Sequence, residues 1–382
     1  MIAPVQLPQP AMSRLHSSSR LHGLDTLRAI AIVLVFMNHY RLFVSDGDAF
    51  GFWGEVGWTG VDLFFGLSGY LIGNQIFAAL RSEHGFSLPR FYARRFLRTL
   101  PNFYVVLALY YLWPVFRGDS PLLPLWRFLT FTQNINLNPG TAFSHAWSLC
   151  VEEQFYVLLP AVALLIAACR QSLSWAWAAV AASFAAGMLV RSYLWQEHVP
   201  GPQSLYGYYK YIYYASWCRF DELVAGVALA LLKNYHPRGW QRATSHGNLA
   251  LLAGLAGAAL VLPVFFTHHY DYWVTVFGYP ALAVSVTLLL VAAMSPGSLL
   301  YRLRVPGAAS LALWSYAIYL LHKQLCILLK PLLQAHGLGP DGWQAMLLMA
   351  LASVLTGWLL YALVETPFMR LRQRYVPSNS AG

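Results

Sequence analysis

Residues 24–40 read LDTLRAIAIVLVFMNHY, an apolar run that carries an arginine near one end and a histidine near the other. His39 follows Arg28 by 11 positions. At about 100° and 1.5 Å per residue, a helix places both side chains on one face, about 16 Å apart along its axis. Ionisable groups are costly in a membrane and usually face a cavity or a partner. The run therefore predicts a helix that lines a passage. From this run alone, an equally good interpretation has Arg28 reaching the lipid headgroups and His39 at the opposite interface.

The composition indicates a protein that crosses a membrane several times. Of the 382 residues, 58% are hydrophobic and 10% are charged, whereas soluble domains are usually about 25% charged. Ten apolar runs are long enough to span a bilayer: 26–44, 58–78, 99–116, 147–169, 174–195, 218–233, 248–267, 272–294, 309–330 and 343–364. The sequence predicts an all-α polytopic membrane helix bundle of about ten transmembrane helices.

The basic residues predict an orientation. The net charge is +10, and in membrane proteins Lys and Arg collect in cytoplasmic loops. With ten alternating spans and a cytoplasmic N-terminus, 16 of the 25 Lys and Arg residues fall on the cytoplasmic side, so we expect both termini there. This divides the chain into a flexible cytoplasmic segment (1–20), one membrane domain (21–370) and a cytoplasmic tail (371–382). No nucleic-acid-binding motif accompanies the charge, so membrane lipid is the expected partner.

Several other classes of protein are disfavoured. The chain has four cysteines, Cys150, Cys169, Cys218 and Cys326. None forms a CxxC pair, so we expect buried thiols and neither a disulfide framework nor a metal site. The sequence has no HExxH, P-loop or GxGxxG context. The first apolar run begins with Asp25 and Arg28 and lacks a convincing cleavage site, which favours a retained helix over a signal peptide.

An arginine cluster opens the third apolar run, in FYARRFLRTLP (91–101). Arg94 and Arg98 lie four residues apart and share a helix face, and Arg95 lies beside them. The planar guanidinium binds phosphate oxygens through two hydrogen bonds. These three arginines and Arg28 are therefore candidates to bind a phosphate-bearing donor. The alternative is that they only fix the orientation of the helix.

Two adjacent glutamates lie in the fourth run, HAWSLCVEEQFYVLLP (145–160). Glu152 and Glu153 are predicted at a depth similar to that of His39. Neighbouring helix positions differ by about 100°, so only one of them is expected to face His39. A carboxylate beside an imidazole orients it and raises its basicity, as a general base requires. The structural alternative is a hydrogen bond that only fastens two helices.

Other polar and aromatic residues fall within the apolar runs GVDLFFGLSGYLIG (60–73), RFDELVAG (219–226) and SYAIYLLH (315–322) and around the two glutamates. The candidates to line the passage are Ser68, Trp147, Ser148, Tyr156, Arg219, Asp221, Tyr316 and His322. For Ser68 and the glycines near it, close helix packing is the favoured interpretation. Aromatic residues also crowd the predicted outer loops, where an interfacial belt is favoured over a sugar-binding surface.

These motifs together resemble the integral-membrane acyltransferase 3 family. The resemblance rests on the Arg28–x10–His39 pair and on WSLCVEEQFY, in the family's order. GVDLFFGLSGYLI, RRFLRTLP, RFDELVAG, SYAIYLLH and VETPFMRL (364–371) add to it. It covers nearly the whole chain. The apolar pieces are individually weak, whereas the Arg–His pair combined with WSLxxE is specific.

The resemblance implies transfer of an acyl group, often acetyl, from cytoplasmic acyl-CoA to a hydroxyl, typically of a surface or secreted glycan. Carried over by position, His39 is the catalytic histidine, Arg28 its paired arginine, and Glu152 the acid of WSLxxE in preference to Glu153. Acyl-CoA is then a substrate, and no permanently bound cofactor is expected. Most of the family occurs in the bacterial inner membrane. The given sequence ends soon after its expected tenth span, so we do not expect the extracytoplasmic hydrolase-like domain that some members append.

Two other functions remain open. Intramembrane Arg, His and Glu also mark proton-coupled transporters, although no inverted repeat is visible here. A transporter moves its substrate unchanged, whereas an acyltransferase consumes acyl-CoA and releases a thiol. A non-catalytic membrane scaffold would bind no CoA and tolerate substitution of His39 and Glu152. The leading hypothesis is an O-acyltransferase in which His39 is the general base and Glu152 orients it.

Overall fold

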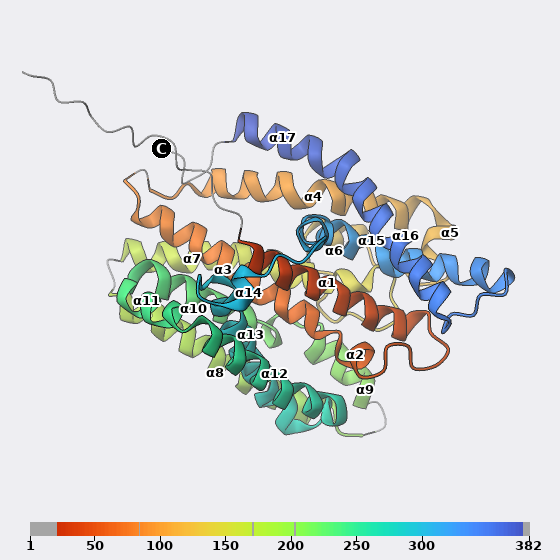
Figure 1. The fold of residues 1–382 in the computed structure, drawn as a ribbon, viewed down its shortest axis with the longest axis horizontal. Helices are drawn as coiled ribbons and strands as arrows, with labels where there is room; N and C mark the ends of the chain where they lie inside the picture. The colour runs from red at the N-terminus through yellow and green to blue at the C-terminus, as the bar shows by residue number, and fades with distance from the viewer. Residues whose placement is uncertain (1–20, 84, 170–171, 202–203, 377–382) are drawn as a thin grey trace, which may run out of the picture.

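The computed structural model describes residues 21–83, 85–169, 172–201 and 204–376, which fold as a helical bundle (Figure 1). The long helices are α1 (His22–Phe43), α3 (Thr59–Arg81), α4 (Leu88–Leu112), α7 (Trp147–Ala168), α8 (Leu173–His198), α10 (Asp221–Tyr235), α12 (Gly247–His268), α13 (Tyr279–Met294), α15 (Ala308–Ala335) and α16 (Trp343–Leu360). Shorter helices are α2 (Gly51–Val56), α5 (Pro114–Arg117), α6 (Leu125–Leu129), α9 (Ser204–Tyr208), α11 (Pro237–Ser245), α14 (Leu299–Arg302) and α17 (Thr366–Tyr375). Single 3-10 turns are η1 (Ser144–Ala146) and η3 (Ser216–Cys218), and π turns are η2 (Tyr209–Tyr213), η4 (Val274–Gly278) and η5 (Tyr361–Glu365).

Each of the ten predicted apolar runs lies on one of the long helices, which confirms a polytopic helical bundle. By length and hydropathy, eight helical stretches of the described residues qualify as membrane spans. The long helices that do not qualify are α4 and α10. The first turns of α4 carry the arginine cluster, and α10 has only 15 residues. The number of ten spans and the cytoplasmic location of both termini stay predictions.

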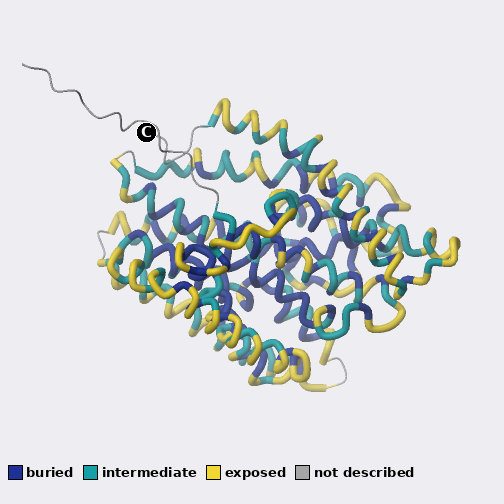
Figure 2. Tube along the Cα trace, viewed as in Figure 1, coloured by how far each residue is buried: buried dark blue, intermediate teal, exposed yellow. Residues whose placement is uncertain are grey.

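The helices that carry the predicted polar residues lie in the middle of the bundle. Helix α1 packs against α3, α13 and α15, and α3 packs along α10. These central helices carry much of the buried surface, drawn dark blue in Figure 2. By contrast, few residues of α8 and α12 are buried. Helices that are apolar on their exposed side suit contact with lipid.

Glycines let α3 and α10 approach each other closely. A Cβ atom at Gly69 would lie 2.0 Å from the carbonyl oxygen of Leu223, and one at Gly226 would lie 2.3 Å from that of Gly66. Only small residues permit such a contact between helices. The packing role predicted for the glycines of residues 60–73 is therefore confirmed.

The C-terminal helix α17 lies along α4 (Figure 1). It continues through Tyr375, so residues 371–375 belong to a packed helix although the sequence analysis assigned them to a tail. This helix brings Arg372 to the wall of a cavity described below. The predicted N-terminal segment 1–20 and residues 377–382 lie outside the described residues.

Three of the four cysteines are buried free thiols, as predicted: Cys150, Cys218 and Cys326. The prediction is wrong for Cys169, which is exposed. Cys169 follows the last residue of α7, so it lies past the part of the helix that packs against its neighbours. A position beside an apolar run does not by itself bury a side chain.

Candidate active site

The larger of two polar cavities beside α1 has a volume of about 510 Å³ and is called here the arginine cavity. Five arginines from three helices line it: Arg28, Arg94, Arg95, Arg98 and Arg372. Three glutamates also line it, Glu152, Glu153 and Glu365, so the basic groups exceed the carboxylates by two. All four arginines that the sequence predicted as donor-binding thus meet in one cavity, which suits an anionic ligand.

The arginines differ in whether their guanidinium groups already have partners within the protein. The guanidinium of Arg95 lies 3.6 Å from a carboxylate oxygen of Glu153 and 3.8 Å from the ring centroid of Tyr156. Arg94 donates a hydrogen bond to the carbonyl oxygen of Val376. In the described part of the chain, no hydrogen bond or ion pair engages Arg28 or Arg98. These two guanidinium groups are free to bind the phosphates of a ligand.

Hydrogen bonds between helices fix one wall of the arginine cavity. The hydroxyl of Tyr316 in α15 donates to the carbonyl oxygen of Thr99 in α4 at 2.9 Å. One turn further, the amide of Asn102 donates to Glu365 at 2.8 Å. Four of the predicted lining residues do line this cavity: Ser68, Ser148, Tyr156 and Tyr316. The cavity therefore has a built polar wall.

The second cavity, called here the histidine pocket, has a volume of about 90 Å³. His39 lines it, together with His145 and Lys323. Its aromatic walls are Phe43, Trp58, Trp147, Tyr209, Tyr213, Tyr214 and Tyr270. The predicted lining residue Trp147 is thus found here. A pocket of this size admits only a small group.

Hydrogen bonds determine which nitrogen of His39 carries the proton. Nδ1 of His322 lies 2.9 Å from the carbonyl oxygen of Ile318 and 3.0 Å from that of Tyr319. Because carbonyl oxygens only accept, this nitrogen must carry a proton, and Nε2 of a neutral His322 must accept. His39 Nδ1 lies 2.7 Å from that Nε2 and therefore donates to it. The remaining nitrogen of His39, Nε2, keeps a free lone pair, which is what a general base needs.

The partner predicted for His39 was wrong. Glu152 accepts a hydrogen bond from Ser68 Oγ at 2.7 Å, and both glutamates line the arginine cavity. Among the described residues, no hydrogen bond joins either glutamate to His39, whose ring instead lies nearly parallel to the hydrogen-bonded ring of His322, with an interplanar angle of 9° and centroids 4.9 Å apart. Glu152 and His39 were predicted at equal depth in the membrane, but depth does not decide which faces of their helices meet. The hydrogen-bond partner of His39 is therefore His322 and not Glu152.

A thin partition separates the two cavities. Adjacent residues of α7 line opposite sides, since Trp147 faces the histidine pocket and Ser148 the arginine cavity. The hydroxyl of Tyr319 donates to the carbonyl oxygen of His145 at 2.6 Å and accepts from Ser148 Oγ at 2.6 Å. The sequence analysis expected Arg28 and His39 to line one continuous passage. They line two different cavities instead.

Three candidates for the passage, Arg219, Asp221 and His322, line neither cavity. Arg219 is fully buried and pairs with Asp62 at 2.5 Å, while Asp221 pairs with Arg191 at 2.5 Å. The guanidinium of Arg219 also lies within cation–π distance of four rings: Trp58, Trp147, Tyr213 and Tyr279. Three of these rings form walls of the histidine pocket. Arg219 thus packs against three rings of the pocket wall without lining the pocket itself.

Most residues that line the two cavities lie in a region that matches a known protein family. A family model described as an acyltransferase domain, of acyltransferase type 3, matches residues 21–362. The chain belongs to the acyltransferase 3 family. Both histidines of the hydrogen-bonded pair and Arg28, Arg94, Arg95 and Arg98 lie inside the matched region. Glu365 and Arg372 lie beyond it, although they line the same arginine cavity.

Curated relatives cover nearly the whole chain. It is 26% identical over 380 residues to the peptidoglycan O-acetyltransferase OatA of Listeria monocytogenes, covering 93% of this chain and 57% of OatA. It is 29% identical over 366 residues to the putative peptidoglycan O-acetyltransferase YrhL of Bacillus subtilis, with 90% and 54% covered. For the putative membrane-bound transacylase BcsY of Komagataeibacter xylinus the identity is 29%, with 91% and 82% covered. The chain spans little more than half the length of the first two. No solved structure matches it.

Three residues of this acyltransferase 3 site were missed by the sequence analysis. His145 stands in the quoted run 145–160 without an assigned role. Its Nε2 donates to the carbonyl oxygen of Leu320 at 3.2 Å, and its Nδ1 is buried without a partner among the described residues. Lys323 follows the SYAIYLLH motif directly, and Arg372 was counted only as a positive-inside residue. The sequence shows that His145 and Lys323 lie in or beside the quoted motifs. It does not show which way their side chains face.

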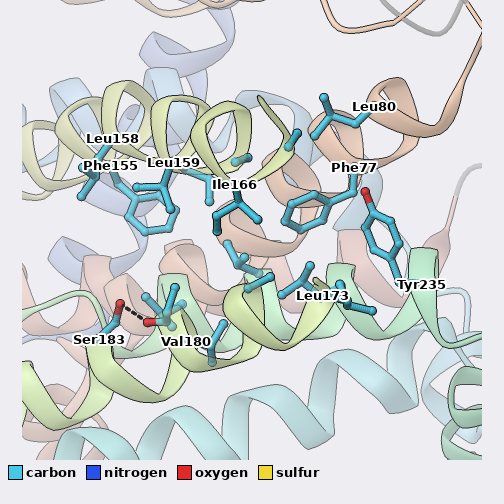
Figure 3. A pocket seen from close by; sticks show the side chains of 18 residues that line it. Phe77, Leu80, Phe155, Leu158, Leu159, Ile166, Leu173, Val180, Ser183 and Tyr235 are labelled. Atoms are coloured by element: carbon cyan, nitrogen blue, oxygen red, sulfur yellow. Dashed lines mark hydrogen bonds between the residues drawn. The ribbon is translucent and has the colours of Figure 1, made fainter. Parts of the chain in front are cut away.

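A third cavity carries no chemistry for this acyltransferase 3 domain. It has a volume of about 250 Å³ and lies between α7 and α8. Figure 3 shows Phe155, Leu159 and Ile166 facing Val180 across it. Only Ser183 and Tyr235 add polar atoms to its lining. Its almost wholly apolar lining suits a hydrocarbon group.

The histidine pair of this acyltransferase 3 domain gives a first prediction. We expect His322→Ala to lower kcat about 10²–10⁴-fold, because His39 loses the acceptor that holds its tautomer. In His322→Gln the side-chain carbonyl oxygen can accept from His39 Nδ1. Its kcat should therefore be about tenfold higher than that of His322→Ala. The check is steady-state thiol release, with the KM for acetyl-CoA as control. A raised KM with unchanged kcat would show that His322 only shapes the donor site.

Proposed function

We propose that the chain is a membrane O-acyltransferase that moves an acyl group, acetyl in the first instance, from acyl-CoA to a hydroxyl of a glycan. Membership of the acyltransferase 3 family supports acyl transfer. Two of the relatives are named peptidoglycan O-acetyltransferases, which supports a carbohydrate acceptor. The donor and the catalytic residues are proposed from the geometry.

The observation that carries the proposal is the paired histidine at one end of α1 and the arginine cavity at the other. His39 Nδ1 is bound to His322, so its Nε2 is available to a hydroxyl in the histidine pocket. The free guanidinium groups of Arg28 and Arg98 suit the phosphates of a CoA ester. The two ends of this arrangement lie about 16 Å apart on the axis of α1. The flexible arm that links the phosphates of CoA to its thioester suits this separation.

The chemistry assigned to these residues is a general-base transfer. His39 Nε2 removes the proton of the acceptor hydroxyl, and the oxygen attacks the carbonyl carbon of the thioester. The carbon–sulfur bond then breaks, the thiolate takes the proton from His39, and the ester and the CoA thiol leave. Capture of the acetyl group on His39 itself is a second route to the same products.

The acyl arm must pass the partition to reach His39. Tyr319 and Ser148 close this point through their shared hydrogen bond, and both line the arginine cavity. Displacing a side chain that makes two hydrogen bonds is a small cost beside the binding of the donor phosphates. We assign the crossing of the arm to this point of the partition.

The two cavities also define the two sides of the reaction. We place the arginine cavity toward the cytoplasm, where acyl-CoA is made, and the histidine pocket toward the opposite face. The positive-inside distribution of Lys and Arg supports this orientation. The relatives come from bacteria, which supports the bacterial plasma membrane as the location.

The proposal is tested by following a labelled acetyl group. Purified protein in nanodiscs receives isotope-labelled acetyl-CoA and glycan fragments, and mass spectrometry locates the label. The expected result is an ester on the glycan and one free thiol for each ester formed. Uptake of labelled acetyl-CoA or glycan into vesicles without chemical change would instead identify a transporter. Absence of both CoA binding and thiol release would contradict the proposal and favour a transporter.

A second prediction concerns the donor. We expect Arg98→Ala to raise the KM for acetyl-CoA about 10–100-fold, because a hydrogen bond to a charged group contributes about 1.5–3 kcal/mol. Arg90→Ala removes a positive charge from the same helix outside the cavity and is the matched control. The KM for the glycan should not change in either variant. Equal effects of Arg98→Ala on both KM values would assign Arg98 a structural role.

A further inference from the structure

Lys323 is a buried cation beside the histidine pair. It follows His322 in α15, is 8% exposed, and lines the histidine pocket together with His39. Its Nζ lies 3.9 Å from the ring centroid of Phe43. The same ring meets the ring of His39 edge-on, with centroids 5.8 Å apart. The ammonium and the imidazole therefore face the same small space.

The positive charge of Lys323 forms no ion pair with a described residue. Its one hydrogen bond to a described residue runs from Nζ to Ser144 Oγ at 3.3 Å. In the described part of the chain no carboxylate pairs with it, and Glu55, which also lines the pocket, pairs with Arg41. An ammonium group has three N–H donors, so two remain for a ligand.

An unpaired buried cation is costly to keep. The cost is offset if a negative charge enters the pocket during the reaction. Attack of a hydroxyl on a thioester creates such a charge, on the former carbonyl oxygen. Donors placed in advance around this oxygen commonly supply a large part of the rate enhancement of acyl transfer.

We propose that Lys323 is a catalytic residue that donates a hydrogen bond to this oxyanion. The inference rests on the proposed function and adds the group that stabilises the transition state. When the acceptor oxygen bonds to the carbonyl carbon, its proton goes to His39 Nε2 and the electron pair of the C=O bond goes to the oxygen beside Lys323. When the C=O bond reforms, the electrons of the carbon–sulfur bond leave with sulfur. Lys323 ends the cycle unchanged.

The charge of Lys323 also acts on His39. A cation opposes the imidazolium that forms as His39 takes the proton. The proposal therefore requires the oxyanion to lie closer to Nζ than the imidazolium does. Removing the charge of Lys323 shows which influence dominates. If stabilisation of the oxyanion dominates, kcat falls; if repulsion of the imidazolium dominates, kcat rises.

The test replaces Lys323 with a neutral side chain of similar shape. We expect Lys323→Met to lower kcat about 10²–10³-fold, the loss typical of removing one donor to an oxyanion. The KM values for acetyl-CoA and glycan should stay within about threefold. Lys323→Arg, which keeps the charge, should recover part of the rate. Lys330→Met, two turns along α15 at an exposed ion pair with Asp46, is the matched control.

Acetyl-CoA binding and thermal unfolding in detergent show that each variant is folded. A raised KM for the glycan with unchanged kcat would overturn the proposal and make Lys323 a binding group for an anionic acceptor. An increased kcat in Lys323→Met would also overturn it, because repulsion of the imidazolium would then dominate. Wild-type protein that binds acetyl-CoA but acylates nothing would overturn the proposed function together with this inference. An active wild type with a fully active Lys323→Met would overturn this inference alone.

Discussion

His39→Ala is expected to lower thiol release from acetyl-CoA about 10²–10⁴-fold, the contribution typical of a positioned general base. Alanine removes both the free Nε2 and the donor to His322. The side chain of His39 makes no hydrogen bond to a described residue other than His322, so the fold should survive. Steady-state thiol release in the presence of a glycan acceptor measures the effect.

A matched histidine control is available at the end of α12. His268 is exposed and pairs only with the neighbouring Asp271 among the described residues, so His268→Ala should keep wild-type activity. Unfolding temperature and acetyl-CoA binding of His39→Ala should also match wild type. If folded His39→Ala protein kept at least about a third of wild-type transfer, His39 would not be the general base, since the loss would lie far below that expected.

Arg219→Met is expected to destabilise the protein by about 3–5 kcal/mol, the cost of breaking a buried ion pair by removing one partner. Asp62 would be left fully buried with its charge uncompensated. Four aromatic rings would also lose the cation on which they pack. Chemical denaturation in mixed micelles measures the free energy of unfolding.

Two further variants separate this effect from general damage. The double variant Asp62→Asn with Arg219→Met should be more stable than Arg219→Met alone, because the buried carboxylate of Asp62 is no longer left as an unpaired charge. Arg41→Met removes an ion pair with Glu55 that is partly exposed, and should cost less than about 1 kcal/mol. Equal losses in Arg219→Met and Arg41→Met would contradict the structural role assigned to Arg219.

The parts of the fold that depend on local pattern could be predicted from the sequence. Apolar runs predicted the long helices, and the glycines of residues 60–73 predicted close packing of α3 against a neighbouring helix, which the structure shows to be α10. The arginines of α4 could be grouped because i and i+4 positions share a helix face. Each of these patterns can be read within one short stretch of the chain.

The parts that depend on which helix faces meet could not be predicted. His39 and His322 are 283 positions apart, and Glu152 lies at a depth that made it an equally reasonable partner for His39. Arg219 was a candidate for the passage because charges in a membrane usually mark one. Here an ion pair and four rings satisfy its charge instead. Arg372 joins the site only because α17 folds back along α4.

The most direct test of the central claim is transfer across a sealed vesicle. The claim is that a donor bound at the arginine cavity acylates a hydroxyl in the histidine pocket on the other side of the membrane. The protein is reconstituted in one orientation, with labelled acetyl-CoA on the side of the arginine cavity and glycan on the other. We predict labelled ester on the glycan and free thiol on the side where the donor was added, both lost in His39→Ala. Ester formed only when donor and glycan share one side would contradict the claim.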